Sequence, residues 1–216
     1  NDSTVCSAIG HCIAYDTCQC PTGYTGEQCE KKIFGSLRSR GYNANGQIGD
    51  DYLIHRTGMT KVYYPLGDGA LVSKIVASYL ISFAITTSGE LYSWGRGAYY
   101  RLGNQALTDQ LIPTPVLTDH KIVSVCSGDY HSVAVTSEGK IYSWGVNTLS
   151  GLTDNTDQIS GQLGVGASIT YSSTPLLLDP INGTPIEVAC GARHTLVLTK
   201  EGHVFGFGDD VSYGYG

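Results

Sequence analysis

Short hydrophobic runs that alternate with polar residues follow one another along most of the chain. Residues 82–86, 132–136 and 195–199 are three such runs, and each leads through a glycine-containing turn into a second apolar run. Alternation with a period of two residues is typical of β-strands that bury one face. No segment has the period of an amphipathic helix, so the pattern predicts an all-β fold.

The whole pattern recurs along the chain. Trp94-Gly95 lies 50 residues before Trp144-Gly145, and Phe207-Gly208 follows 63 residues after that. A glycine-rich loop, a Leu-Gly or Ile-Gly pair and a proline-led apolar run complete each repeat, which makes four predicted strands. Four short strands in about 50 residues are typical of a β-propeller blade, a small sheet that buries its faces against neighbouring blades. Residues 33–216 are therefore expected to form about two complete and two partial four-stranded blades of a propeller that is incomplete at both ends.

One repeat carries a specific motif. It runs from Gly128-Asp129-Tyr130-His131 through Trp144-Gly145 to Gly161-Gln162-Leu163-Gly164. This motif resembles the regulator-of-chromosome-condensation repeat, in which a Gly-x-x-His turn, a Trp-Gly pair and a Gly-Gln-Leu-Gly loop recur. The preceding unit departs from it, with Ser78 and Ile81 where the glycine and histidine are expected. The resemblance implies a propeller that its members usually close with seven blades, so we expect the chain to be a fragment of a longer protein.

The cysteines are concentrated at the N-terminus, where five of the seven lie within the first 29 residues. So short a segment cannot bury a hydrophobic core, which leaves disulfides or a metal to hold its fold. The short pair Cys18-Gln19-Cys20 and the placement of His11 beside Cys12 do not match zinc-ligand spacing. Disulfides are the favoured interpretation, and they indicate an oxidising compartment.

These cysteines, with Gly23-Tyr24-Thr25-Gly26 before the last of them, resemble an EGF-like module over residues 1–30. The spacing matches the second to sixth cysteines of that family, so the first would lie upstream of Asn1. The resemblance implies two disulfides and leaves Cys12 unpaired; the implied pairs are Cys6–Cys18 and Cys20–Cys29.

Composition narrows the class of protein further. Charged residues make up 15% of the chain and the formal net charge is −6, which disfavours binding to nucleic acid. The longest apolar stretch, residues 75–85, is too short to cross a membrane.

No constellation of residues indicates catalysis, a cofactor or a metal. His131 and His194 occupy the same place in consecutive repeats, which favours a blade-to-blade hydrogen bond over a catalytic role. The acidic pairs Asp50-Asp51 and Asp209-Asp210 are expected to be solvated, and the segment 154–157 lacks the glycine and final glutamate of a calcium loop. Cys126 and Cys190 are one residue out of register in consecutive blades, so we expect them to be buried free thiols.

Asn182-Gly183-Thr184 is a glycosylation sequon between two predicted blades, and Asn182 is expected to be exposed. Together, these features predict a non-enzymatic extracellular or cell-surface protein whose propeller binds a protein or glycan ligand. The alternative is a guanine-nucleotide exchange factor or regulator of a small GTPase, which the resemblance to the regulator-of-chromosome-condensation family implies.

Cys12 provides a test of the N-terminal assignment. Each implied disulfide closes a loop of roughly a dozen residues and should stabilise the module by about 2–3 kcal/mol. The unpaired Cys12 thiol should form covalent dimers in oxidised protein, and Cys12→Ser should abolish them. Non-reducing peptide mapping checks the pairing, and a Cys12–Cys18 or Cys12–Cys20 disulfide would show that the alignment is wrong.

Overall fold

The computed structural model describes residues 37–63, 71–148, 161–166 and 168–208, and the backbone of four short N-terminal strands. These strands form two antiparallel pairs: β1 (His11–Ala14) with β2 (Thr17–Gln19), and β3 (Tyr24–Thr25) with β4 (Lys31–Lys32). Cys12 lies opposite Cys18 in the first pair. Cys6, Cys20 and Cys29 lie outside the described residues, so the disulfide pairing stays a prediction.

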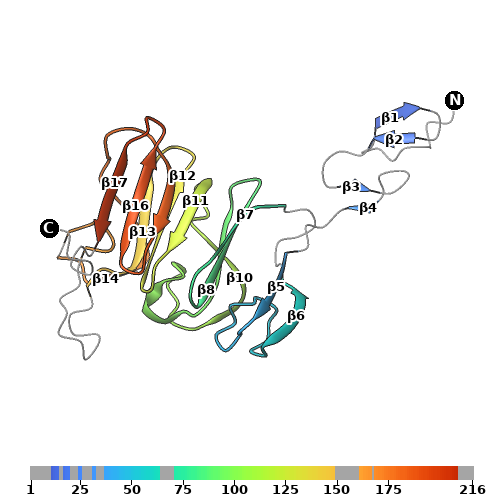
Figure 1. Cartoon of the computed structure of the whole chain (residues 1–216), viewed down its shortest axis with the longest axis horizontal. Helices are drawn as coiled ribbons and strands as arrows, with labels where there is room; N and C mark the ends of the chain where they lie inside the picture. Colours follow the sequence, from blue (N-terminus) through green and yellow to red (C-terminus); the bar gives the residue numbers. More distant parts are fainter. Residues whose placement is uncertain are drawn as a thin grey trace.

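The rest of the described chain forms four antiparallel sheets, which we number as blades I to IV (Figure 1). Blade I is the hairpin of β5 (Arg38–Gly41) and β6 (Arg56–Lys61). Blade II consists of β7 (Val72–Ala77), β8 (Ile81–Thr86), β9 (Leu91–Gly95) and β10 (Gln110–Val116), with a short 3-10 helix η1 (Ala98–Tyr100). Blade III consists of β11 (Ile122–Ser127), β12 (His131–Thr136), β13 (Ile141–Val146) and β14 (Tyr171–Leu177). Blade IV consists of β15 (Pro185–Cys190), β16 (His194–Thr199) and β17 (Val204–Gly208).

The predicted architecture is confirmed for the described residues. Two sheets have four strands, and the partial ones have two and three. The strands of blades II and III pair in chain order, so we call them A to D; β5 and β6 correspond to C and D, and β15–β17 to A, B and C. In Figure 1 the blades succeed one another from right to left, from cyan through green and yellow to red.

The core lies between the faces of neighbouring blades. Blades II and III enclose one cluster of buried side chains, in which the rings of Phe83 and Trp144 meet edge to face at 6.3 Å. Blades III and IV enclose a second cluster, which includes Val133, Val188 and Val197. The alternating runs of the sequence supply these residues, because every second side chain of a strand points to the same face.

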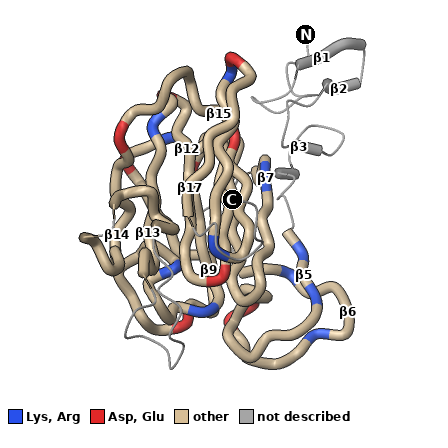
Figure 2. Tube along the Cα trace, turned by 60° about the vertical axis from the view of Figure 1, so that its left-hand side comes forward, with Lys and Arg blue, Asp and Glu red and all other residues tan. Residues whose placement is uncertain are grey.

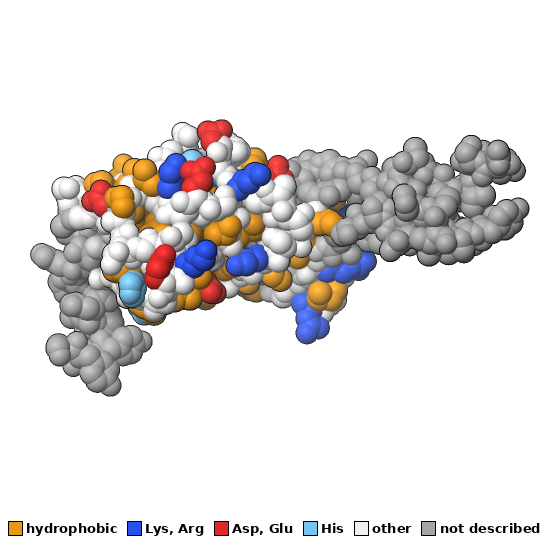
Figure 3. Space-filling view, turned by 90° about the horizontal axis from the view of Figure 1, so that it is seen from above, with side chains coloured by type: hydrophobic (Ala, Val, Ile, Leu, Met, Phe, Trp, Pro, Cys, Tyr) orange, Lys and Arg blue, Asp and Glu red, His pale blue; other side chains and the backbone are white. Residues whose placement is uncertain are grey.

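The two ends of the blades differ in chemistry. The B–C turns carry exposed charged residues, and Figure 3 shows this end with acidic, basic and histidine side chains scattered over it; they include Glu90, Glu138, Lys140, Lys200 and Glu201. Figure 2 places further basic residues along β5 and β6. The A–B turns and C–D loops form the opposite end, toward the lower edge of Figure 1. Among the described residues, no helix has the length and apolar character to cross a membrane.

The longest C–D loop is that of blade III. The 63-residue spacing between Trp144 and Phe207 is 13 residues longer than the 50-residue spacing before it, and the sequence places this surplus around residues 149–160. These residues lie outside the described part of the chain. The base of the loop is closed by a hydrogen bond from the Gly161 N–H to the Asn147 carbonyl at 3.0 Å. In blade I the Gly46 N–H makes the equivalent bond to the Asn43 carbonyl at 3.3 Å, with two residues between. The hydrogen bond that closes the base of the loop can therefore form without residues 149–160.

Replacing residues 149–160 by a single asparagine reproduces the Asn43–Gly46 connection. We expect the free energy of unfolding to change by less than about 1 kcal/mol, because loop length affects loop-closure entropy only weakly. Urea unfolding of the two proteins measures the difference. Loss of the folded state would show instead that the segment is part of the blade.

Candidate interaction site

A main-chain carbonyl between blades holds the C–D loops of blades I and II in place. The Arg101 carbonyl of blade II accepts hydrogen bonds from Ser132 Oγ and Trp144 Nε1 of blade III, both at 2.8 Å. One blade earlier, the Gln47 carbonyl accepts from Ser82 Oγ at 2.9 Å and Trp94 Nε1 at 3.0 Å. Trp94 and Trp144 thus fix the C–D loops of blades I and II, and with them any binding residue on those loops.

The A–B turns are positioned by the Gly-x-x-His motif. A Cβ atom at Gly128 would lie 2.5 Å from Cε1 of His131, so the histidine ring needs a glycine beneath it. Gly191 and His194 repeat this arrangement in blade IV. In blade II, Ile81 replaces the histidine and Ser78 replaces the glycine, and the Ser78 N–H still bonds to the Ile81 carbonyl at 3.0 Å. A Cβ atom at Gly128 would also lie 2.6 Å from the Gly191 and Ala192 carbonyl oxygens, whereas in blade II the Ser78 hydroxyl donates to the Ser127 carbonyl at 3.3 Å.

His131 makes the predicted blade-to-blade hydrogen bond. Its Nε2 lies 2.9 Å from Thr195 Oγ1 of blade IV, and its side chain is fully buried. Burial, followed by the proximity of His194, lowers the pKa of His131 to about 4. The imidazole is therefore neutral at physiological pH and acts as a structural link.

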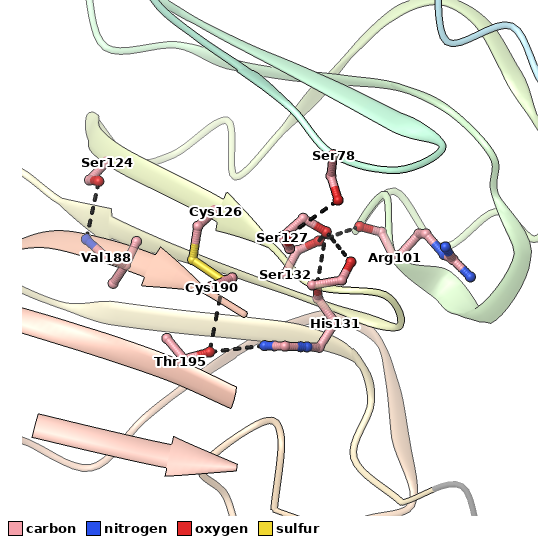
Figure 4. Close-up of a disulfide and its surroundings, with 11 residues drawn as sticks. Ser78, Arg101, Ser124, Cys126, Ser127, His131, Ser132, Val188, Cys190 and Thr195 are labelled. Carbon is pink, nitrogen blue, oxygen red and sulfur yellow. Dashed lines mark hydrogen bonds between the residues drawn. A yellow bond between two sulfur atoms is a disulfide. The ribbon is translucent and has the colours of Figure 1, made fainter. Parts of the chain in front are cut away.

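The prediction that Cys126 and Cys190 are free thiols is wrong, because they form a disulfide between β11 and β15 (Figure 4). Their Cα atoms are 5.5 Å apart, well within disulfide range. The prediction assumed that equivalent strands of neighbouring blades are too far apart, but these A strands are in contact. The Val188 N–H bonds to Ser124 Oγ at 3.2 Å across the same junction.

The C–D loop of blade II contains a pair of strained tyrosines. Tyr99 and Tyr100 have φ of 66° and 57°, a left-handed conformation that bulky residues rarely adopt. The positions equivalent to Tyr100 are Gly46 and Gly161, with φ of 79° and 93°. Glycine adopts such angles without strain, so the tyrosine at this position costs conformational energy.

The strained tyrosines form an aromatic cluster with the neighbouring blade. Tyr100 stacks on Tyr171 with ring centroids 5.2 Å apart, and Tyr99 meets Tyr130 edge to face at the same distance. The Arg101 guanidinium lies 5.3 Å from the Tyr99 ring and 5.5 Å from the Tyr130 ring. Burial of this guanidinium, together with the nearby charge of Arg96, lowers the pKa of Arg101, which still leaves it fully charged.

A hollow of about 490 Å³ opens within this cluster, and its walls are almost entirely apolar; they are Ala98, Tyr99, Tyr100, Leu107, Val146 and Tyr171. Large hydrophobic side chains are exposed on the A–B turns and C–D loops at this same end of the blades; they are Tyr42, Tyr52, Leu53, Ile54, Tyr79, Leu107 and Tyr171. Exposed aromatic side chains beside an apolar hollow are typical of a surface that binds another molecule. We call this end of the blades the aromatic end.

The sequence did not predict this site, since its tyrosines stand where the motif has other residues. The one available signal was Tyr99-Tyr100-Arg101 in place of the Asn45-Gly46-Gln47 of blade I.

The other candidate residues lie apart from the aromatic cluster. His55 Nδ1 accepts from the Asn43 N–H at 2.9 Å, His120 Nε2 lies 2.8 Å from the Tyr142 hydroxyl, and His203 is exposed. Within the described ranges, no three histidine, cysteine or acidic residues gather as metal ligands. Asn182 is exposed between β14 and β15, as expected. The side chain of His11 and the segments 154–157 and 209–210 lie outside the described residues.

The prediction that Asp50 is solvated is wrong. Asp50 is buried, where its carboxylate accepts from Arg56 Nε at 2.6 Å and from Asn43 Nδ2 at 3.2 Å. The loop folds back on itself and brings these partners together. Asp51 is exposed, as expected.

Blades of four antiparallel strands, linked through a C-strand tryptophan and a Gly-x-x-His turn, define a repeat propeller. The model of the regulator of chromosome condensation (RCC1) repeat matches residues 88–135 and 138–198, and a second model of this repeat matches residues 72–101, 122–150 and 186–214. The chain belongs to the RCC1 repeat family.

Curated relatives are much longer than this chain. E3 ubiquitin-protein ligase HERC2 of Mus musculus is 34% identical over 195 residues, which are 84% of this chain and 4% of the relative. Ultraviolet-B receptor UVR8 of Arabidopsis thaliana is 32% identical over 181 residues, which are 81% of this chain and 37% of the relative. The chain thus spans well under half the length of either protein.

Solved structures share the fold. Human WBSCR16 has a TM-score of 0.66 and 23% identity, covering 82% of this chain and 44% of its own. Prp20p of Saccharomyces cerevisiae has a TM-score of 0.62 and 24% identity, covering 82% of this chain and 40% of its own. The Prp20p structure is described together with the binding of Prp20p to Gsp1p and histones.

The buried His131 predicts a dependence of stability on pH. Its pKa is about 4 in the folded chain against 6.5 for the free side chain, so between these values the unfolded chain binds a proton that the folded chain does not. The stabilisation from neutral His131 is therefore present above pH 6.5 and is lost as the pH falls toward 4, by about 3 kcal/mol in total.

His131→Gln should be less stable than the parent at pH 7, and the gap should shrink toward pH 4. Urea unfolding across this pH range measures it. His203→Gln is the control, since His203 is exposed on the B–C turn of blade IV, at the other end of the blade from His131, and its removal should leave the pH dependence unchanged. A gap that stays constant with pH would contradict the assignment.

Proposed function

We propose that this chain is a non-enzymatic, regulatory protein-binding module that contacts its partner through the aromatic end of the blades. The observation that carries the proposal is the cluster of exposed aromatic and aliphatic side chains around the hollow. Tyrosine is enriched where proteins bind each other, because it gives a large contact area and a hydrogen-bonding tip at little entropic cost. Among the described residues, the opposite end also has a hollow, but it is smaller, at about 320 Å³, and its lining includes the charged residues Lys140 and Asp179.

A small GTPase is the first partner to test. This candidate is supported by family membership and by the fold shared with Prp20p, whose described binding properties include Gsp1p. The earlier preference for an extracellular ligand is less well supported by these relatives, and a glycan ligand has no support among them. The ligase activity named for HERC2 is not part of the proposal, because the match covers only 4% of that protein.

A binding assay with matched variants tests the proposed surface. The purified chain is titrated with Gsp1p and with histones, and nucleotide release from Gsp1p is followed in parallel. Tyr79→Ala with Leu107→Ala, at the aromatic end, should weaken binding by about tenfold or more, since truncated anchors commonly cost over 1 kcal/mol each. Glu138→Ala with Lys140→Ala, on a B–C turn at the charged end, should change binding less than about twofold because exposed ion pairs contribute little.

Three outcomes are informative. Binding that is lost in the aromatic variant supports the surface, and accelerated nucleotide release adds exchange activity to it. Binding lost only in the charged variant would contradict the proposed surface. If neither Gsp1p nor histones bind the parent chain, the small GTPase candidate is contradicted.

A specific observation keeps the extracellular alternative as a second candidate. The Cys126–Cys190 disulfide links two blades, and disulfides persist mainly in oxidising compartments. The exposed Asn182 sequon and the proposed EGF-like module over residues 1–30 fit the same compartment. A C-terminal tag on the full-length protein separates the candidates: extracellular or cell-surface signal with an oxidised Cys126–Cys190 pair supports secretion, whereas nuclear or cytosolic signal with free thiols contradicts it.

A further inference from the structure

The strain at Tyr100 has no explanation in the local fold. Blades I and III build the same loop with Gly46 and Gly161, which adopt the left-handed conformation freely. A bulky residue there is strained, because the left-handed conformation brings its Cβ atom close to a carbonyl oxygen. Backbone strain of this kind is concentrated at functional sites, where it places a side chain that the relaxed residue could not provide.

The strained side chain forms a wall of the hollow. Tyr100 stacks on Tyr171 with an interplanar angle of 16°, and both rings line the space of about 490 Å³. A glycine at position 100 would remove this wall. The volume is within the range of small ligand sites and can hold a large apolar side chain from another molecule.

Arg101 adds a positive charge against Tyr99, one of the residues that line the hollow, although Arg101 is not itself part of the lining. The residue is 3% exposed, and its Nε donates to the Ala98 carbonyl at 3.0 Å. The ion pairs among the described residues are Arg56–Asp50 and Lys140–Glu138, so within that part of the chain Arg101 has no carboxylate at ion-pair distance. Figure 4 shows its guanidinium directed away from β12 and the disulfide. A buried cation without a carboxylate favours an anion beside it.

The other charges nearby do not neutralise Arg101. Arg96 lies on the same loop and adds positive charge, whereas Asp129 acts on Arg101 in the opposite sense. The carboxylate of Asp109 is already used, since it accepts from Asn45 Nδ2 at 2.7 Å and from the Gly97 N–H at 3.0 Å. A cationic ligand for the tyrosine rings is disfavoured, because the Arg101 guanidinium already lies against Tyr99 and Tyr130.

We propose that the hollow binds an acidic segment of a partner protein, in which a carboxylate adjoins a phenylalanine or leucine side chain. The apolar side chain enters between Tyr100, Tyr171 and Leu107, and the carboxylate lies at the Tyr99 wall, against which the Arg101 guanidinium packs. This inference rests on the proposed function and specifies the chemistry of the partner. The inference concerns only the segment of the partner protein that enters the hollow, and it holds for any protein that contains such a segment.

Three synthetic peptides test the chemistry of the site on the whole chain. The first has Phe between two Asp-Glu pairs, the second has Lys in place of each acid, and the third has Ala in place of Phe. We expect the first to bind and each control to bind about tenfold more weakly by calorimetry, in line with the loss of one anchor. Binding should also shift the NMR signals of the Arg101 Nε–H and the tyrosine rings. Equal or tighter binding of the Lys peptide, or no binding of the acidic Phe peptide, would overturn the proposal.

Tyr100→Gly is the sharpest variant because it introduces the residue that the equivalent loops already carry. Its melting temperature should match or exceed that of the parent, since the strain is relieved, while affinity for the acidic Phe peptide should fall by about tenfold. Tyr63→Ala is the control, an exposed tyrosine that is not among the residues of the aromatic end, and should bind as the parent does. Unchanged affinity in Tyr100→Gly would overturn the proposal even if the peptide binds.

The two proposals can fail separately. In one case, the Tyr79→Ala, Leu107→Ala double variant loses binding to a protein partner, but the acidic Phe peptide does not bind the parent. That result supports the proposed function and rejects the acidic segment as the ligand of the hollow. Binding of the acidic Phe peptide that Tyr100→Gly abolishes supports the hollow, even where Gsp1p and histones do not bind.

Discussion

The contact between each C-strand tryptophan and a carbonyl of the preceding blade is the interaction on which this propeller segment depends. It buries a large side chain and pairs its N–H group with a main-chain carbonyl that also accepts a hydrogen bond from a serine hydroxyl. Trp94 makes the contact with Gln47, and Trp144 makes it with Arg101. Each such hydrogen bond is worth about 1 kcal/mol net, but leaving the buried groups unpaired would cost more, so the contact fixes how one blade sits on the next. The C–D loops inherit their positions from it.

The junction between blades III and IV shows what replaces this contact when the tryptophan is absent. Phe207 occupies the tryptophan position in blade IV and has no N–H to donate. The same junction carries the His131–Thr195 hydrogen bond, the Cys126–Cys190 disulfide and a bond from the Asp129 N–H to the Ala192 carbonyl at 2.8 Å. These links join the A strands and A–B turns instead of the C strand. One junction of the propeller is therefore held near its inner strands by connections that the repeat motif alone does not supply.

These contacts explain which features could be predicted from the sequence. The strands of blades II and III follow from alternation and repetition, and the link through His131 follows from the recurrence of histidine at one position. The Cys126–Cys190 disulfide could not be predicted, because sequence register gives no distance between neighbouring A strands. The burial of Asp50 depends on a loop that returns Arg56 and Asn43 to it, which the pattern of charges does not show. The site around Tyr100 depends on a backbone angle, and a sequence shows only that the expected glycine is missing.

The replacement of glycine by tyrosine at position 100 separates stability from binding within one loop. A repeat motif that forms the same turn in every blade has the same residue type at the same position of each turn. Glycine is the least strained residue at a position with positive φ. Blade II departs from that choice at Tyr100, which brings the ring against Tyr171 of blade III and creates a hollow that spans two blades. The propeller can tolerate the strain because the Arg101 carbonyl, one residue later, is held by Ser132 and Trp144. The hydrogen bond from Trp144 to the Arg101 carbonyl, which fixes blade III on blade II, thus also allows the C–D loop of blade II to carry a strained tyrosine where other blades have an unstrained glycine.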